Sequence, residues 1–96
     1  MRVVVSYDVE TVTKEGRNRL RKVGKTCKSY GVRVQLSVFE CSVGPKEVVL
    51  LRAALLALID TTKDSLRIWY IAEDDATKTE HHGVRDPIDV DGPLIV

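Results

Sequence analysis

The sequence predicts an α+β fold, and three observations support this. Apolar, strand-like segments alternate with two stretches of helical periodicity, in the order strand, helix, extended segment, helix, strand and a further short strand. With 96 residues the chain forms one small domain and has no room for a second. The order gives two βαβ-like halves, which predicts a ferredoxin-like βαββαβ sandwich with an extra C-terminal strand.

The first strand is expected from about Arg2 to Asp8. Its run of valines, Val3 to Val5, indicates burial on both faces and therefore a central strand. A carboxylate at the end of a buried strand needs solvent, a helix cap, a partner cation or a metal. Asp8 is thus the first candidate functional residue.

The first helix is expected from about Lys14 to Ser29, with Thr13 as its N-cap. The pair Tyr30-Gly31 is expected to end it with a glycine C-cap. One side of this helix is an apolar stripe with three- and four-residue spacing. The stripe consists of Gly16, Leu20, Val23, Cys27 and Tyr30.

The segment Arg33 to Val43 is extended but long for a single strand. It is either two short strands or one strand with a break near Gln35 to Ser37. A second helix is expected from about Pro45, a favourable first-turn residue, to Asp60. This helix is apolar nearly all round, which indicates burial on more than one side and suggests a subunit interface.

Two more strands are expected, from Asp64 to Ala72 and from Lys78 to Val84. Residues 1–84 then form the domain and residues 85–96 a tail. The polar tail ends in an apolar triplet, which is expected to dock as an edge strand on its own sheet or on a partner's. The triplet is Leu94, Ile95 and Val96.

Charge is distributed unevenly along the chain, although the net charge is only +1. Between Thr13 and Arg33 there are eight basic residues and one acid, whereas from Glu73 to Val96 there are seven acids and two basic residues. Most solvated helix faces mix both signs. The N-terminal third can therefore attract a polyanion, and the C-terminal quarter cannot.

Several classes of protein and site are disfavoured. No apolar run approaches the roughly 20 residues that span a bilayer, and the N-terminal stretch is too short for a signal peptide, so a cytoplasmic protein without membrane contact is expected. Cys27 and Cys41 are expected as buried, reduced thiols. The adjacent His81 and His82 would point to opposite faces of a strand and cannot bind one metal together.

Five motifs in one order carry a resemblance that covers essentially the whole chain. They are SYDV, RNRLRKV, YGVRVQLSVFEC, DSLRIWY and the terminal DGPLIV. Together they resemble the CRISPR-associated protein 2 family, the small ferredoxin-like subunit of the spacer-acquisition machinery. The EHHG segment and the DGPLIV ending look like the branch found with type I-C systems.

The resemblance implies a homodimer whose two sheets face each other, with each C-terminal segment adding a strand to its neighbour. It implies that Asp8, with Tyr7 beside it, is the metal ligand and catalytic residue, with Mg²⁺ as the ion and Mn²⁺ also suitable. It implies a nuclease acting on RNA or double-stranded DNA. It further implies an adaptor that holds a DNA prespacer between integrase dimers of CRISPR-associated protein 1. Supporting roles are implied for Arg17, Arg19, Arg33 and Phe39.

Simpler interpretations exist for the same residues. Asp8 could cap the first helix or pair with Arg17, and a single carboxylate is a poor magnesium site unless a twofold axis doubles it. Arg33 could contact phosphate or pair with Glu40 or Asp8. Core packing is favoured over base stacking for the aromatic candidates, Tyr7 and Phe39. The helix cations Arg17, Arg19, Arg21 and Lys25 are expected to contact phosphates rather than form a merely solvated face.

Two classes of function follow from these residues: a structural DNA-binding adaptor and a metal-dependent endonuclease centred on Asp8. Both can belong to one chain. An adaptor without physiological nuclease activity, or a toxin-like ribonuclease of the same fold, is the alternative. A neighbouring integrase gene would argue against the toxin.

Overall fold

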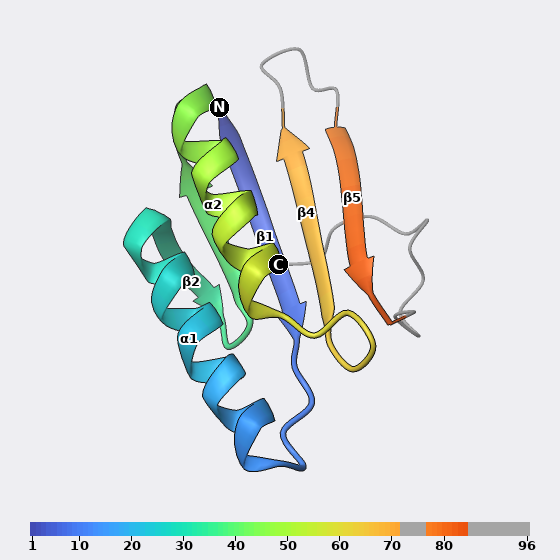
Figure 1. The fold of residues 1–96 in the computed structure, drawn as a ribbon. Helices are drawn as coiled ribbons and strands as arrows, with labels where there is room; N and C mark the ends of the chain where they lie inside the picture. Colours follow the sequence, from blue (N-terminus) through green and yellow to red (C-terminus); the bar gives the residue numbers. More distant parts are fainter. Residues whose placement is uncertain (72–76, 85–96) are drawn as a thin grey trace.

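A computed structural model of the chain describes residues 1–71 and 77–84. Five strands form one antiparallel sheet in the order β2-β3-β1-β4-β5, and both helices lie on the same face of it (Figure 1). The first four strands and the helices have the ferredoxin-like arrangement, with β5 added at one edge, so the predicted fold is confirmed. The elements are β1 (Arg2–Asp8), α1 (Lys14–Tyr30), β2 (Gly31–Gln35), β3 (Val38–Ser42), α2 (Pro45–Leu58), β4 (Ser65–Ile71) and β5 (Thr77–Gly83).

Strand β1 is central, as its valine run predicts. It pairs with β3 on one side and with β4 on the other. Val3, Val4 and Val5 are all buried. The core lies between the sheet and the two helices, where Val5, Phe39 and Leu55 are fully buried.

The extended segment after α1 is two strands, which confirms one of the two predicted alternatives. A turn at Leu36 and Ser37 separates β2 from β3. The backbone N–H of Tyr7 donates to the Ser37 carbonyl at 3.1 Å, so this turn is attached to the end of β1. The turn is thereby placed beside α1, where the candidate site lies.

Helix α1 begins and ends close to the predicted residues. The Thr13 hydroxyl accepts a hydrogen bond from the Gly16 N–H at 3.0 Å, which confirms the N-cap. Gly31 is the C-cap, which confirms the predicted glycine cap, and its N–H donates to the Cys27 carbonyl; its backbone is extended, with φ of −161°. Glycine is needed there because a Cβ would lie 2.4 Å from the Glu40 carbonyl oxygen and 2.5 Å from Cys41 Sγ.

Helix α2 is buried on one side only within this chain, where the sequence indicated burial on more than one. Leu51 and Leu55 face the core, whereas Val49 and Leu50 are 64% and 51% exposed. The subunit interface suggested for this helix stays a prediction. Strand β5 confirms the further short strand, while the tail, with Leu94, Ile95 and Val96, lies outside the described residues. Within residues 1–71 and 77–84, neither helix is long and apolar enough to cross a membrane.

Candidate nucleic-acid interface and the Asp8 strand end

Asp8 is the exposed last residue of β1 and lies opposite Ser65 of β4. Its neighbour Tyr7 is only 4% exposed and belongs to the core between sheet and helices. Because successive side chains of a strand point to opposite faces, Asp8 points to the face that the helices leave open. Asp8 and Tyr7 are adjacent in sequence, but their side chains lie on opposite faces of the sheet.

Neither simpler interpretation of Asp8 fits the described structure. Thr13 caps the helix, and the Arg17 side chain donates to the carbonyls of Thr11 and Val12 at 3.2 and 3.4 Å. Among the described residues, the Asp8 carboxylate takes part in no hydrogen bond or ion pair. This exposed carboxylate is therefore available to a cation or to another chain.

Asp8 is the candidate ligand for the predicted magnesium ion, and its surroundings can be compared with what that ion requires. The described ranges contain no group of three or more His, Cys, Asp or Glu side chains that could hold a metal. Mg²⁺ bound with nucleotide substrates takes one or two carboxylates and completes its shell with waters and phosphate oxygens. One exposed carboxylate fits that sparse pattern, provided that phosphate or a second copy of Asp8 supplies further oxygens.

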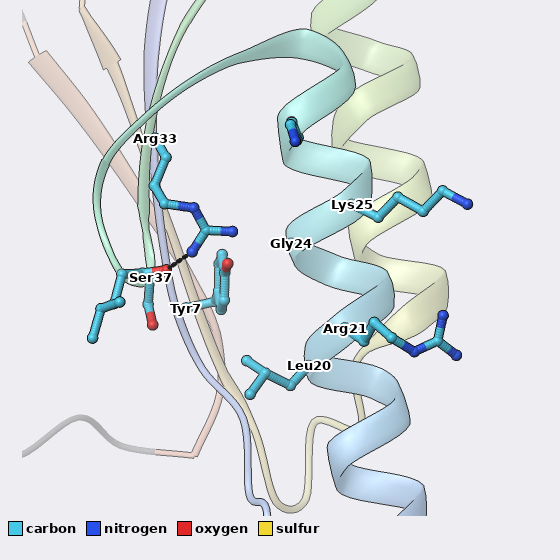
Figure 2. Close-up of a pocket in the computed structure, with 9 residues that line it drawn as sticks. Tyr7, Leu20, Arg21, Gly24, Lys25, Arg33 and Ser37 are labelled. Atoms are coloured by element: carbon cyan, nitrogen blue, oxygen red, sulfur yellow. Dashed lines mark hydrogen bonds between the residues drawn. The ribbon is translucent and has the colours of Figure 1, made fainter.

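A groove of about 590 Å³ lies between α1 and the turn that joins β2 to β3 (Figure 2). It opens on the helix side of the sheet, away from Asp8. Among the described residues, four cationic side chains line it and no acidic one does. The lining residues are Tyr7, Leu20, Arg21, Gly24, Lys25, Lys28, Arg33, Leu36 and Ser37.

The sheet side of this groove is built from stacked side chains. The rings of Tyr7 and Phe39 stack with their centroids 6.3 Å apart, and the guanidinium carbon of Arg33 lies 4.8 Å from the Phe39 centroid. Arg33 Nη1 also donates to the Leu36 carbonyl. Burial raises the pKa of the Tyr7 phenol, an effect that Cys27 strengthens and the charge of Arg33 opposes. Phe39 thus packs in the core and supports Arg33, in agreement with the favoured interpretation of core packing.

The helix side of the groove carries exposed cations. Figure 2 shows Tyr7 and Arg33 pointing toward one another beside Gly24, while Arg21 and Lys25 extend from the outer side of α1. Arg21, Lys25 and Lys28 are all exposed to solvent. An anion entering here would meet four cationic side chains and no carboxylate from the part of the chain that the structure describes.

Arg19 contacts a different partner. Its Nε lies 2.8 Å from Asp64 Oδ2 and its Nη2 lies 3.2 Å from Asp64 Oδ1. Asp64 is fully buried and also accepts hydrogen bonds from the backbone N–H groups of Glu10 and Asp60, at 3.1 and 2.8 Å. In this chain Arg19 is therefore engaged with a buried carboxylate instead of pointing freely to solvent.

Burial by itself would raise the pKa of Asp64. The hydrogen bonds from Arg19 and from the backbone of Asp60 and Glu10 outweigh it, so the pKa of Asp64 is lowered. This carboxylate joins α1 to the loops that follow β1 and α2.

The candidate residues thus separate into four groups. Asp8 lies on the open face, four others surround the groove, Phe39 packs in the core against Arg33, and Arg17 and Arg19 hold loops near the start of α1. The four around the groove are Tyr7, Arg21, Lys25 and Arg33. The sequence did not single out Asp64 and Gly24, and Lys28 was counted only among the basic residues of the first helix. Lys28 had a usable signal, since it follows Lys25 by three residues on the same side of the helix.

Residues 1–79 match the model of the CRISPR associated protein Cas2 family. The chain belongs to the Cas2 family. This confirms the resemblance drawn from the five motifs, while the type I-C-like branch stays a prediction.

Among its Cas2 relatives is the CRISPR-associated endoribonuclease Cas2 of Chlorobaculum tepidum, which is 48% identical over 96 residues and covers 100% of both chains. The CRISPR-associated endonuclease Cas2 of Halalkalibacterium halodurans is 48% identical over 95 residues and covers 99% of each. The crystal structure of Streptococcus pyogenes Cas2 is 50% identical with a TM-score of 0.69, over 77% of this chain and 89% of that one. The relatives' names specify RNA in one case and no particular nucleic acid in the other.

Proposed function

We propose that this Cas2 family protein is a dimeric adaptor of CRISPR adaptation that binds prespacer DNA and docks the integrase, CRISPR-associated protein 1. We further propose that the dimer has metal-dependent endonuclease activity centred on Asp8, on double-stranded DNA or single-stranded RNA. The observation that carries the binding role is the cationic groove, whose described lining contains no acidic residue.

Binding of this kind is sequence-blind. Lysine and arginine side chains on α1 meet phosphates, and phosphate contacts position a nucleic acid without reading its bases. Such contacts release counterions, so the affinity falls steeply with salt. The proposal is supported by the exposure of Arg21, Lys25 and Lys28, which the described structure leaves without an acidic partner in the groove.

The nuclease role is supported by the names of the relatives and by the position of Asp8. A second copy apposed through the open face of the sheet would bring a second Asp8 to the first. Two such carboxylates would repel each other without a cation or a shared proton between them. When bound there, Mg²⁺ would supply an activated water and neutralise charge on the scissile phosphate. Asp8 itself would hold the ion and orient the phosphate.

The test is a comparison of wild type with Asp8→Asn in two assays: cleavage of labelled duplex DNA and single-stranded RNA, and spacer acquisition with the integrase. Glu15→Gln, which removes an exposed carboxylate on α1, is the matched control. We expect Asp8→Asn, and chelation of divalent metal, to abolish cleavage while duplex binding is retained. Full cleavage by a highly purified Asp8→Asn protein would rule out Asp8 as the catalyst.

A purely structural adaptor is the second candidate, and one observation favours it. The groove and Asp8 lie on opposite faces of the sheet, so within one chain the cations that bind a strand do not surround the carboxylate that would cut it. If Asp8→Asn supports full spacer acquisition, the adaptor role stands without nuclease activity. If wild type neither binds duplex DNA nor supports acquisition, the adaptor proposal fails.

A further inference from the structure

Arg33 is presented to the groove in a fixed position. The Phe39 ring lies against one side of its guanidinium, at 4.8 Å from carbon to centroid, and Nη1 is used by the Leu36 carbonyl. A guanidinium has five N–H donors in a planar fork, so this leaves donors for another acceptor. The arginine is thereby oriented before any ligand arrives, which lowers the entropy cost of binding.

Gly24 creates the space in front of this arginine. A Cβ at position 24 would stand 3.2 Å from the Tyr7 hydroxyl and 3.6 Å from Arg33 Nη2. Any side chain there would fill the part of the groove that both polar groups face. Glycine keeps this side of the groove free of a side chain. Tyr7, at 4% exposure, is a deeply buried side chain whose hydroxyl borders this space.

The exposed cations of α1 continue from this point along the helix. Arg21, Lys25 and Lys28 recur at four and three residues, so they follow one side of α1. Seven residues of helix span about 10.5 Å. One strand of a duplex carries a phosphate about every 3.4 Å along its axis, so this row spans about three steps between successive phosphates.

We propose that this groove is a strand-binding site, in which one backbone phosphate is held between Arg33 and Tyr7 opposite Gly24 and its neighbours contact Lys28, Lys25 and Arg21. This rests on the proposed nucleic-acid-binding function and assigns its position. The exposed Leu36 and the half-buried Leu20 form apolar walls against which sugars can pack. Because the groove lies on the helix side of the sheet, the strand held here is not the one cut at Asp8 of the same chain.

The experiment separates occupation of the groove from general attraction to a basic helix. Gly24→Met fills the groove without changing charge. Lys28→Gln removes a charge inside it, and Lys22→Gln removes one from the same helix outside it. Affinity for a fluorescein-labelled duplex of random sequence, and for one of its single strands, is measured by anisotropy over a salt series. Circular dichroism and urea unfolding check each fold.

We expect Gly24→Met to weaken binding about tenfold, which is close to the contribution of one hydrogen bond to a charged group. Lys28→Gln should reduce the slope of log affinity against log salt by about 0.9, the value for one phosphate that is no longer neutralised, and Lys22→Gln should not. If Gly24→Met fails to fold, the test of the groove rests on Gly24→Ala and on the comparison of Lys28→Gln with Lys22→Gln.

Equal slopes for Lys28→Gln and Lys22→Gln, or wild-type affinity for a folded Gly24→Met, would overturn the groove and leave general nucleic-acid binding intact. Absence of binding by the wild type would instead refute the proposed function. Inorganic phosphate at matched ionic strength is the probe for a site that takes free phosphate. If inorganic phosphate competes only weakly with the labelled duplex, the result supports a site for a nucleic-acid strand. If it displaces the duplex fully, the strand site is overturned.

Discussion

Arg19 and Asp64 form a bidentate ion pair across 45 residues of sequence, with Nε 2.8 Å from Oδ2 and Nη2 3.2 Å from Oδ1. The carboxylate is fully buried and its oxygens also accept from two backbone N–H groups, those of Glu10 and Asp60. Val84 at the end of β5 donates its N–H to the Asp64 carbonyl at 2.8 Å. One residue thus connects α1, the loop after β1, the loop after α2 and the end of β5.

Asp64→Asn should therefore destabilise the fold strongly. The amide nitrogen of asparagine would face N–H donors, and Arg19 would lose its partner charge. Removing one member of a buried ion pair typically costs about 3–5 kcal/mol in the free energy of unfolding. Urea unfolding measures the loss.

Glu40→Gln is the matched control, because it breaks the exposed 3.3 Å pair with Arg2. Its cost should stay below about 1 kcal/mol. Equal stability of Asp64→Asn and wild type would contradict the structural role of this pair.

Glu80 predicts a loss of stability in acid. Hydrogen bonds from Arg52, then from Tyr70 and His82, outweigh burial and lower the pKa of Glu80 to about 2 from its ordinary 4.5. A lowered folded-state pKa stabilises the fold above pH 4.5, and that contribution is lost as the pH falls from 4.5 toward 2. Glu80→Gln should flatten the dependence of unfolding free energy on pH in this window.

Arg52→Gln removes the main donor to Glu80, at 2.7 Å from Nε, and should flatten the same window. Asp64, whose pKa is also lowered, would keep a residual slope in both variants. A wild-type slope in Glu80→Gln would mean that this carboxylate does not stabilise the fold.

Gly31→Ala should cost about 1–3 kcal/mol, the usual range for overpacking. The new Cβ would meet the Glu40 carbonyl oxygen at 2.4 Å, a backbone atom held in β3. Gly44→Ala is the comparison, since its Cβ would meet only the movable Glu47 carboxylate, at 3.1 Å. Thermal unfolding of both variants gives the contrast, and a fully stable Gly31→Ala would refute the steric explanation.

The protein is expected to be a dimer at micromolar concentration. The exposed Val49 and Leu50 of α2 offer apolar surface to a partner, and the sequence of the tail ends in an apolar triplet. Deletion of residues 93–96 should weaken the dimer if this segment adds an edge strand to a partner. Light scattering measures the mass. A folded monomer would contradict the expected dimer, and an unchanged dissociation constant after truncation would contradict the expected role of the tail.

Much of the fold follows from patterns within a few residues of sequence. The valine run determined that β1 is central, and Thr13 determined where α1 begins. The spacing of cations determined the charged side of α1. Even the opposite orientations of Tyr7 and Asp8 follow from strand alternation. These features are local, because hydrogen-bonded turns and pleats repeat every two to four residues.

The tertiary structure decided which basic side chains of α1 remain available to contact a phosphate. Helical spacing places Arg19 beside the apolar stripe and Arg21 away from it, but the sequence does not show that Asp64 is the ion-pair partner of Arg19. Tyr7, Gly24 and Arg33 come from three elements, and their meeting depends on how α1 packs on β1 and on the position of β2 beside β3. Local periodicity holds no information on such distant neighbours, because strand register and helix packing are set by the whole core at once.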